Sequence, residues 1–374
     1  MMKIQMVDLL SQYEKIKEEV DAGIHETIEE TAFINGPSVK LFQSELASYL
    51  EVKSVITCAN GTDALQVAMM ALDLQPGDEV ITSNFTFIAT VEVISLLKLK
   101  PVLVDVDPNT FNLDPKKVEE ALTPKTKAII PVHLFGQSAD MDEILRIAKE
   151  NKLYVIEDAA QALGTDYYSS AGSHKKAGTI GTIGTTSFFP SKNLGCFGDG
   201  GALMTNNEEL GEKIRVIVNH GSQVKYYHEE IGVNSRLDTI QAAILRVKLR
   251  HLVTYNQARR SAADYYDKLL AGHDQIQTPA RYAKSSHIFH QYTLRIKSGQ
   301  RDSIRQKLAD QNIPAMIYYP VPLSLQVAFL SAGYKKGDFP VTELLCQEVL
   351  SLPMHTELNN AQQEYIVEHL LKFI

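Results

Sequence analysis

The order of apolar and polar positions along the chain predicts a series of alternating strands and helices. Five short apolar runs are typical of buried strands, at residues 55–59, 80–83, 101–105, 128–133 and 153–157. Between them, residues 62–72, 86–98, 115–122 and 140–151 show helical spacing. Strands that alternate with helices in this way form a mainly parallel sheet covered on both faces. The pattern therefore predicts an α/β fold.

Helical spacing also flanks this series. Apolar residues recur at steps of three and four from Tyr13 to Ile28, and a second helix is expected from Val39 to Leu50. Two glycine-rich β segments follow the fifth strand, at residues 182–189 and 201–204. A helix is then expected at residues 207–219, and a long amphipathic helix at residues 238–268.

A chain of 374 residues exceeds what one hydrophobic core usually organises. The long stretch 238–268 has the length to bridge two domains. We therefore predict a large domain, residues 1–250, and a smaller C-terminal α+β domain, residues 251–374. In the smaller domain, short strands are expected at residues 288–296 and 315–318.

Charge and composition exclude several classes of protein. With 37 basic and 45 acidic residues the formal net charge is −8, which disfavours binding to nucleic acid or to an anionic membrane. The first residues do not resemble a signal peptide, and no run of 18 apolar residues occurs, so a cytoplasmic protein is expected. The three cysteines lie far apart, which argues against a disulfide framework or a zinc site.

The strand at residues 153–157 leads into Asp158. Ligands of open α/β sheets bind at the carboxyl ends of the strands. A carboxylate at this position could hold a protonated ring nitrogen. The alternative is that it caps a helix over residues 159–163.

Lys192 lies among aromatic, proline and glycine residues, in the segment 187–195. Desolvation there would lower its pKa, and a neutral amine can attack a carbonyl. The alternative is an ordinary solvated lysine.

Residues 58–65 lead from a strand through Gly61 into a helix, with Thr62 and Asp63 in its first turn. A helix N-terminus with free amides is a natural phosphate site, although Thr62 or Asp63 could instead be the helix cap. Together with Asp158 and Lys192, this segment completes the three anchors of pyridoxal 5′-phosphate (PLP): a partner for the pyridine nitrogen, a Schiff-base lysine and a phosphate site.

Many ordered motifs across the whole chain resemble the DegT/DnrJ/EryC1/StrS family of nucleotide-sugar aminotransferases. This family lies within the aspartate-aminotransferase group (fold type I) of PLP enzymes. The matching segments are residues 33–37, 60–65, 86–90, 104–107, 131–137, 157–162, 189–195, 198–201 and 232–238.

The resemblance implies a role for each matching residue. Lys192 would bind PLP covalently and shuttle a proton, and Asp158 would keep the pyridine nitrogen protonated. Gln161 would hydrogen-bond the phenolic oxygen of the ring, and Phe87 would stack on its face, the alternative being a core aromatic. Phosphate contacts are implied for Gly61, Thr62, Asp63 and Ser187.

Asn234 resembles the residue that reaches the phosphate from the neighbouring subunit, so the resemblance also implies a homodimer with shared active sites. We predict a ping-pong transamination. Glutamate would convert PLP to pyridoxamine 5′-phosphate, and a 3-oxo nucleotide sugar would then accept the amine.

The motif around Lys192, with residues 198–201 as Gly-Asp-Gly-Gly, is similar to the C3-aminating branch of the family. The whole chain most resembles enzymes that act on UDP-2-acetamido-2-deoxy-3-oxo-glucuronate in the synthesis of bacterial surface polysaccharide (O-antigen). Arg236 could bind the C6 carboxylate of such a sugar, the alternative being a structural salt bridge with Asp238 or a neighbour. Tyr318 and Tyr319 are candidates for substrate contacts or for packing.

Several alternatives stay open. The substrate could be a dTDP-3-oxo-6-deoxyhexose, or the amine could be placed at C4. Two others are disfavoured: a related dehydratase would replace Lys192 by histidine, and a nicotinamide dehydrogenase would need a G-x-G-x-x-G turn after its first strand, which is absent. A regulatory role without catalysis is also conceivable. His287 and His290 have metal-like spacing but no third ligand, so they are interpreted as structural or as substrate contacts.

Overall fold

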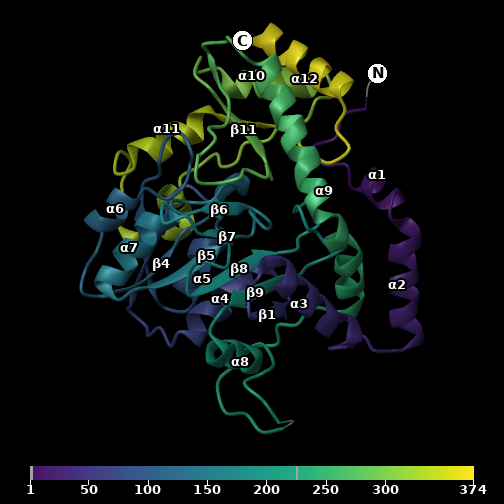
Figure 1. Ribbon diagram of the computed structural model, residues 1–374. Helices are drawn as coiled ribbons and strands as arrows, with labels where there is room; N and C mark the ends of the chain where they lie inside the picture. Colours follow the sequence, from purple (N-terminus) through teal and green to yellow (C-terminus); the bar gives the residue numbers. More distant parts are fainter. Residues whose placement is uncertain (1–2, 225) are drawn as a thin grey trace.

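The structure, a computed structural model, describes residues 3–224 and 226–374 and has the expected α/β architecture (Figure 1). Its main sheet has the strand order β1-β9-β8-β5-β4-β2-β3. Neighbouring strands pair in parallel except β9, which is antiparallel to β1 and β8. The strands are β1 (Ser54–Cys58), β2 (Glu79–Ser83), β3 (Lys100–Val104), β4 (Thr126–Ile130), β5 (Tyr154–Asp158), β8 (Ile183–Ser187) and β9 (Gly201–Thr205).

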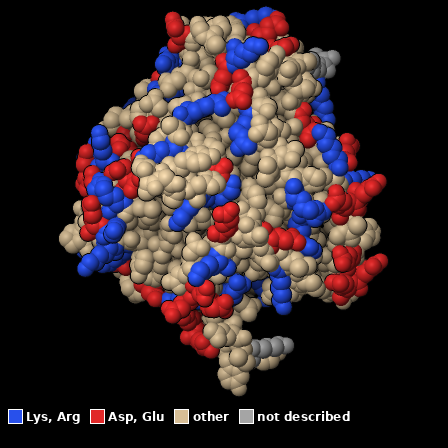
Figure 2. All heavy atoms as spheres, viewed as in Figure 1, with Lys and Arg blue, Asp and Glu red and all other residues tan. Residues whose placement is uncertain are grey.

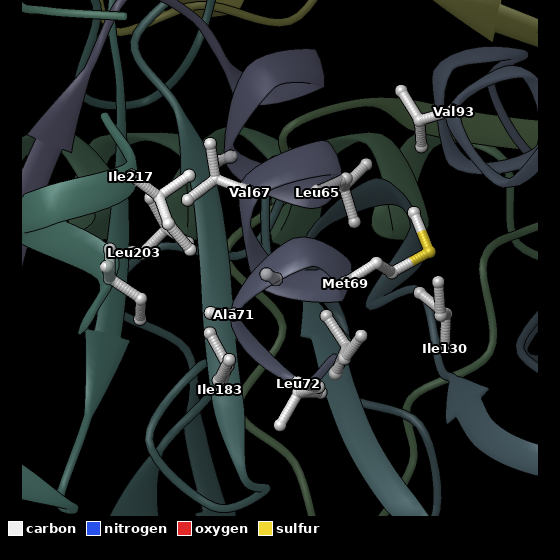
Figure 3. Packing of buried hydrophobic residues seen from close by; sticks show 14 of the residues in the cluster. Leu65, Val67, Met69, Ala71, Leu72, Val93, Ile130, Ile183, Leu203 and Ile217 are labelled. Atoms are coloured by element: carbon white, nitrogen blue, oxygen red, sulfur yellow. The ribbon is translucent and has the colours of Figure 1, made fainter. Parts of the chain in front are cut away.

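Helices cover both faces of this sheet. Successive residues of one strand enter opposite clusters: Ile130 packs with α4 and α8, and Ile129 packs with α7. Figure 3 shows α4 at the centre of the first cluster. The helices of this part are α1 (Leu9–Glu14), α2 (Lys17–Glu29), α3 (Pro37–Leu50), α4 (Gly61–Ala71), α5 (Ala89–Leu96), α6 (Pro115–Glu120), α7 (Met141–Asn151), α8 (Glu208–Ile217) and α9 (Thr239–Leu269).

The C-terminal part is built on a small antiparallel sheet with the order β10-β11-β12. The long helix α9 runs from beside the main sheet into the cluster of this part, where Tyr266 is fully buried (Figure 1). The N-terminal segment joins the same cluster through Ile4. The remaining elements are β6 (Asp166–Tyr168), β7 (His174–Lys176), β10 (Ile276–Gln277), β11 (Tyr292–Ile296), α10 (Arg301–Asp310), α11 (Pro340–Glu348), β12 (Val349–Leu352) and α12 (Asn360–Phe373), with short 3-10 turns at Leu134–Gly136, Leu323–Leu325 and Val327–Ala332.

Three local expectations were wrong. The predicted helix from Tyr13 to Ile28 is two helices, α1 and α2, with Ile16 at the start of the second; Ile16 and Val20 nevertheless share one buried face against α9. Residues 159–163 form turns and not a helix. Residues 315–318 form no strand, because Met316 makes a single bridge, to Ser351.

The predicted domain boundary at residue 250 lies inside α9, which continues without interruption to Leu269. The division into residues 1–250 and 251–374 stays a prediction.

Acidic and basic side chains are interspersed over the face shown in Figure 2. Within residues 3–224 and 226–374, no helix combines the length and apolar character that crossing a bilayer requires.

Candidate active site

A cavity of about 790 Å³ lies where β5 and β8 end, beside the first turn of α4. Its volume is in the usual range for small-molecule sites. Parallel strands carry their carboxyl ends to one sheet edge, which is where such folds bind ligands. Ten of the predicted site residues line this cavity: Gly61, Thr62, Asp63, Phe87, Asp158, Gln161, Ser187, Lys192, Tyr318 and Tyr319.

Asp158 is the last residue of β5, and its side chain is 6% exposed. Its Oδ2 accepts a hydrogen bond from Thr90 Oγ1 at 2.8 Å, and its Oδ1 accepts one from the Ala160 amide at 3.1 Å. These two donors fix the plane of the carboxylate at the wall of the cavity. A buried carboxylate held in this way can stabilise a protonated nitrogen of a bound ring.

Lys192 lies in the turn that follows β8 and is half-buried in the cavity wall. Burial lowers the pKa of its amine to about 8, although the negative charge of Asp158 opposes that shift. Lys192 is therefore not a solvated surface lysine. About one-tenth of the amine is neutral at about pH 7, and the neutral form is the one that attacks a carbonyl.

The phosphate end of the cavity is the first turn of α4. Asn60 caps this helix, because its Oδ1 accepts a hydrogen bond from the Asp63 amide at 2.8 Å; the alternative that Thr62 or Asp63 is the cap is wrong. The carboxylate of Asp63 accepts a hydrogen bond from the Ser235 hydroxyl at 2.6 Å. Among these residues, the amides of Gly61 and Thr62 are therefore the available donors.

Gly61 also leaves space that another residue would fill. A Cβ at this position would come within 2.7 Å of the Cβ of Ser187, at the end of β8. The start of α4 and the Ser187 hydroxyl are thus close enough to contact the same phosphate oxygens.

Aromatic residues form another wall. Phe87 is 53% exposed and lines the cavity, so it is not a core residue. Its ring lies 6.4 Å from the ring of Tyr319, between centroids. Gln161 connects this wall to the main chain: its Nε2 donates to the Tyr319 hydroxyl at 3.1 Å, and its Oε1 accepts from the Phe135 amide at 2.8 Å.

Asn234 and Arg236 are not among the residues that line the cavity. Asn234 is exposed, and Arg236 is half-buried. Within the described part of the chain, Arg236 has no ion-pair partner, so the alternative of a salt bridge with Asp238 is wrong. Both residues flank Ser235, whose hydroxyl contacts Asp63 at the phosphate end.

Four supporting residues were not predicted. Behind Asp158, the buried Glu157 accepts a hydrogen bond from His133 Nε2 at 2.8 Å. Burial raises the pKa of Glu157, but His133 and the Gly181 and Gly178 amides outweigh it and hold the pKa below its ordinary value. The unpredicted residues are Thr90, His133, Glu157 and Asn193, and all four lie within motifs that the sequence had already singled out.

These residues fit PLP. Asp158 would pair with the pyridine nitrogen, Lys192 with the aldehyde, and the Gly61 and Thr62 amides with Ser187 would hold the phosphate. No cluster of three or more potential ligands for a metal ion occurs in residues 3–224 and 226–374, so the pair His287 and His290 is not part of one.

Comparisons with known proteins show the family of this chain. The model of the DegT/DnrJ/EryC1/StrS aminotransferase family matches residues 14–371. The chain is 50% identical over 374 residues to the pleiotropic regulatory protein of Geobacillus stearothermophilus, covering 100% of this chain and 99% of that protein. It is 45% identical over 363 residues to the UDP-2-acetamido-2-deoxy-3-oxo-D-glucuronate aminotransferase of Pseudomonas aeruginosa, covering 97% and 98%.

Among solved structures, ntda from Bacillus subtilis with bound cofactor PMP matches with a TM-score of 0.91 at 33% identity, covering 100% of this chain and 85% of that one. The fold is the aspartate aminotransferase-like α/β fold, and the cofactor is PLP with its PMP form. The chain belongs to the DegT/DnrJ/EryC1/StrS aminotransferase family of PLP-dependent nucleotide-sugar aminotransferases.

Proposed function

We propose that this enzyme transfers an amino group from glutamate to the C3 keto group of UDP-2-acetamido-2-deoxy-3-oxo-glucuronate, in the synthesis of bacterial surface polysaccharide. The observation that carries the proposal is the desolvated amine of Lys192, which shares one cavity with the buried carboxylate of Asp158. The choice of sugar is supported by the Pseudomonas aeruginosa relative, whose name states that substrate.

Bound PLP supplies the electron sink and carries the amino group between the two half-reactions. Lys192 would hold the cofactor and, once released from it, move a proton at the reacting carbon of each substrate. Asp158 would keep a proton on the pyridine nitrogen, and Thr90 and the Ala160 amide hold its carboxylate in place. Gln161 would bind the phenolic oxygen through its amide, and Phe87 would cover one ring face.

The charge of the cavity supports a shared site in a homodimer. Of the lining residues that the structure describes, Lys192 is the one lysine or arginine, whereas Asp63, Asp158 and Asp199 are acidic. A phosphate, a diphosphate and the carboxylates of the substrates need more positive charge than this. A second copy of the chain would supply it through Arg236, with Asn234 on the cofactor phosphate.

The segment that carries Asn234 is exposed, as it would need to be to reach the site of a second copy. A bridge between Asn219 and Asn234 closes the base of a hairpin that projects from the body below α8 (Figure 1). Four of its apolar side chains are 60% to 87% exposed: Val224, Tyr226, Tyr227 and Ile231. Such a patch is typical of an interface.

Arg236 would bind the C6 carboxylate of the sugar, since a guanidinium without an ion pair can form two parallel hydrogen bonds to a carboxylate. Tyr318 and Tyr319 would contact the same substrate, because both line the cavity.

The test is an assay of amine transfer from glutamate to a panel of 3-oxo and 4-oxo nucleotide sugars, with mass-spectrometric detection. We expect the UDP-linked 3-oxo uronate to be preferred. Arg236→Ala should lower kcat/KM for the uronate by about 100-fold, as for a lost charged contact, and for a 6-deoxy sugar by much less. Preference for a dTDP-linked 6-deoxyhexose or for a 4-oxo sugar would replace the substrate, and no transfer to any sugar would favour a regulatory role.

A further inference from the structure

The loop that precedes β11 brings a histidine, His290, to the cavity. His290 and Gln291 both line it, on the same side as Tyr318. The His290 side chain is 6% exposed and lies close enough to Lys192 for the lysine charge to lower its pKa. A buried ring at this place could either pack against its neighbours or contact a substrate. The hydrogen bonds of the ring and of its backbone distinguish these two roles.

The backbone around His290 is held from three directions. Arg259 Nη1, on α9, donates to the carbonyl oxygens of Phe289 and His290, both at 3.2 Å. Asn193 Nδ2, next to Lys192, donates to the Ile288 carbonyl at 3.2 Å. The Ile288 amide donates to the Gly136 carbonyl at 2.9 Å. The backbone that carries the His290 ring is therefore fixed beside the cavity.

The ring itself has an unused nitrogen. Nδ1 of His290 is buried and has no hydrogen-bond partner within the described residues. Burial and the positive charges of Lys192 and Arg259 hold the pKa of His290 well below its ordinary value, so the ring is neutral and carries one proton. A proton on Nδ1 would be a buried donor without an acceptor, which is costly. The proton therefore belongs on Nε2.

We propose that the Nε2–H of His290 donates a hydrogen bond to a carboxylate of the amino donor, which makes His290 the residue that positions glutamate beside Lys192. This inference rests on the proposed function. Arg259 lies close enough to the ring for its positive charge to act there, and that charge attracts an anion. A neutral donor also avoids adding a further charge next to the amine that must react.

The neighbouring His287 shows what a structural histidine looks like in the same loop. Its ring is stacked on Phe289 with centroids 3.8 Å apart, and its Nδ1 accepts a hydrogen bond from the Phe289 amide at 3.1 Å. It does not line the cavity of Lys192. His287 is therefore a matched control for the loss of a buried imidazole from this loop.

The test compares two substitutions at His290, each of which places an amide at the position of a different ring nitrogen. The amide of Gln reaches the position of Nε2, whereas the amide of Asn reaches that of Nδ1. The probe is glutarate, a dicarboxylate without an amino group, and its Kd is measured by calorimetry on the PLP-loaded protein. We expect His290→Asn to raise this Kd and the KM for glutamate by about tenfold or more, the usual effect of losing a hydrogen bond to a charged group.

His290→Gln and the control His287→Asn should leave both values within about threefold, which corresponds to less than one ordinary hydrogen bond. The absorbance of bound PLP should be unchanged in all three variants. Equal glutarate affinity in His290→Asn and the unaltered protein would overturn the inference. Equal losses of affinity in the Asn and Gln variants would also overturn it, since they would show that binding depends on the shape of the ring and not on a hydrogen-bond donor at Nε2.

A measurement without any variant covers the case in which His290→Asn does not fold. Nitrogen-15 NMR of labelled histidine should show His290 protonated at Nε2, with that resonance shifting when glutarate is added. Protonation at Nδ1 would overturn the inference. If the unaltered protein transfers an amine from glutamate while His290→Asn behaves normally, only this inference fails; if it transfers none to any sugar, the proposed function itself fails.

Discussion

Lys192 lies in the turn after β8, and Lys248 contacts the same turn from α9; both amines are desolvated, but their roles differ. Burial lowers the pKa of both Lys192 and Lys248 to about 8. Lys248, on α9, is 2% exposed and its Nζ donates to the Gly195 carbonyl at 2.5 Å. Lys192 faces the cavity instead, and no acceptor for its amine occurs among the described residues.

The difference shows that a shifted pKa alone does not identify a reactive amine. Lys248 is desolvated because it packs behind the turn, where its charge lies 5.5 Å from the centre of the Phe197 ring. Its hydrogen bond holds the turn at Gly195, three residues from Lys192. One lysine therefore supports the backbone that presents the other, and access to the cavity decides which of them can react.

The largest effect that separates the two lysines is expected from Lys192→Ala. Borohydride should fix PLP covalently to the unaltered protein, on the peptide that contains Lys192, and should fix none to this variant. Turnover should fall by about a thousandfold or more, because both half-reactions lose their base. Lys248→Met serves as the control, since it should still be labelled at Lys192. Covalent PLP on Lys248 would contradict the comparison.

A smaller effect is expected when PLP is added back to the PLP-free protein at different pH values and the rate of PLP binding is measured. With a pKa near 8, the neutral fraction of Lys192 rises from about one-tenth at about pH 7 to about nine-tenths at about pH 9, so the rate of PLP capture should rise roughly tenfold. The rate is followed by the absorbance of bound PLP. Lys248→Met should leave the midpoint unchanged. A midpoint near that of a solvated lysine would show that the amine is not desolvated.

Much of this fold could be predicted from the local pattern of apolar and polar residues. The five apolar runs are strands β1 to β5, and the helical windows between them are α4 to α7, because a strand and a helix each need a continuous apolar stripe against the same core. The antiparallel placement of β9 between β1 and β8 was not predicted, since strand order depends on contacts far apart in sequence. Strand β12 was missed because α11 ends at Glu348 and the strand begins at Val349, with no turn residue between them.

The site was predictable where a motif carries its chemistry within a few residues, as at Lys192, Asp158 and Gly61. Pairs joined across the fold were not predictable. Thr90 and Asp158 are 68 positions apart, and the sequence left open whether His290 is structural or a substrate contact, without placing it beside Lys192. Their roles depend on which surfaces pack together, and a single sequence does not contain that information.

The smallest effect is expected on the free energy of unfolding, and it tests whether the pKa of Lys248 is lowered as well as that of Lys192. The folded pKa of Lys248 is lowered from 10.5 to about 8, so from about pH 8 upward the unfolded chain binds more protons than the folded one, and folding stability rises with pH until about pH 10.5. Between about pH 7 and pH 9 this lysine should add about 1 kcal/mol to the free energy of unfolding. The measurement is urea unfolding of the unaltered PLP-free protein and of Lys248→Met at both pH values. Lys192 is present in both proteins, so its own titration cancels in the difference. A difference in stability that does not change with pH would mean that the buried amine keeps an ordinary pKa, and the two lysines would then differ in electrostatics as well as in access.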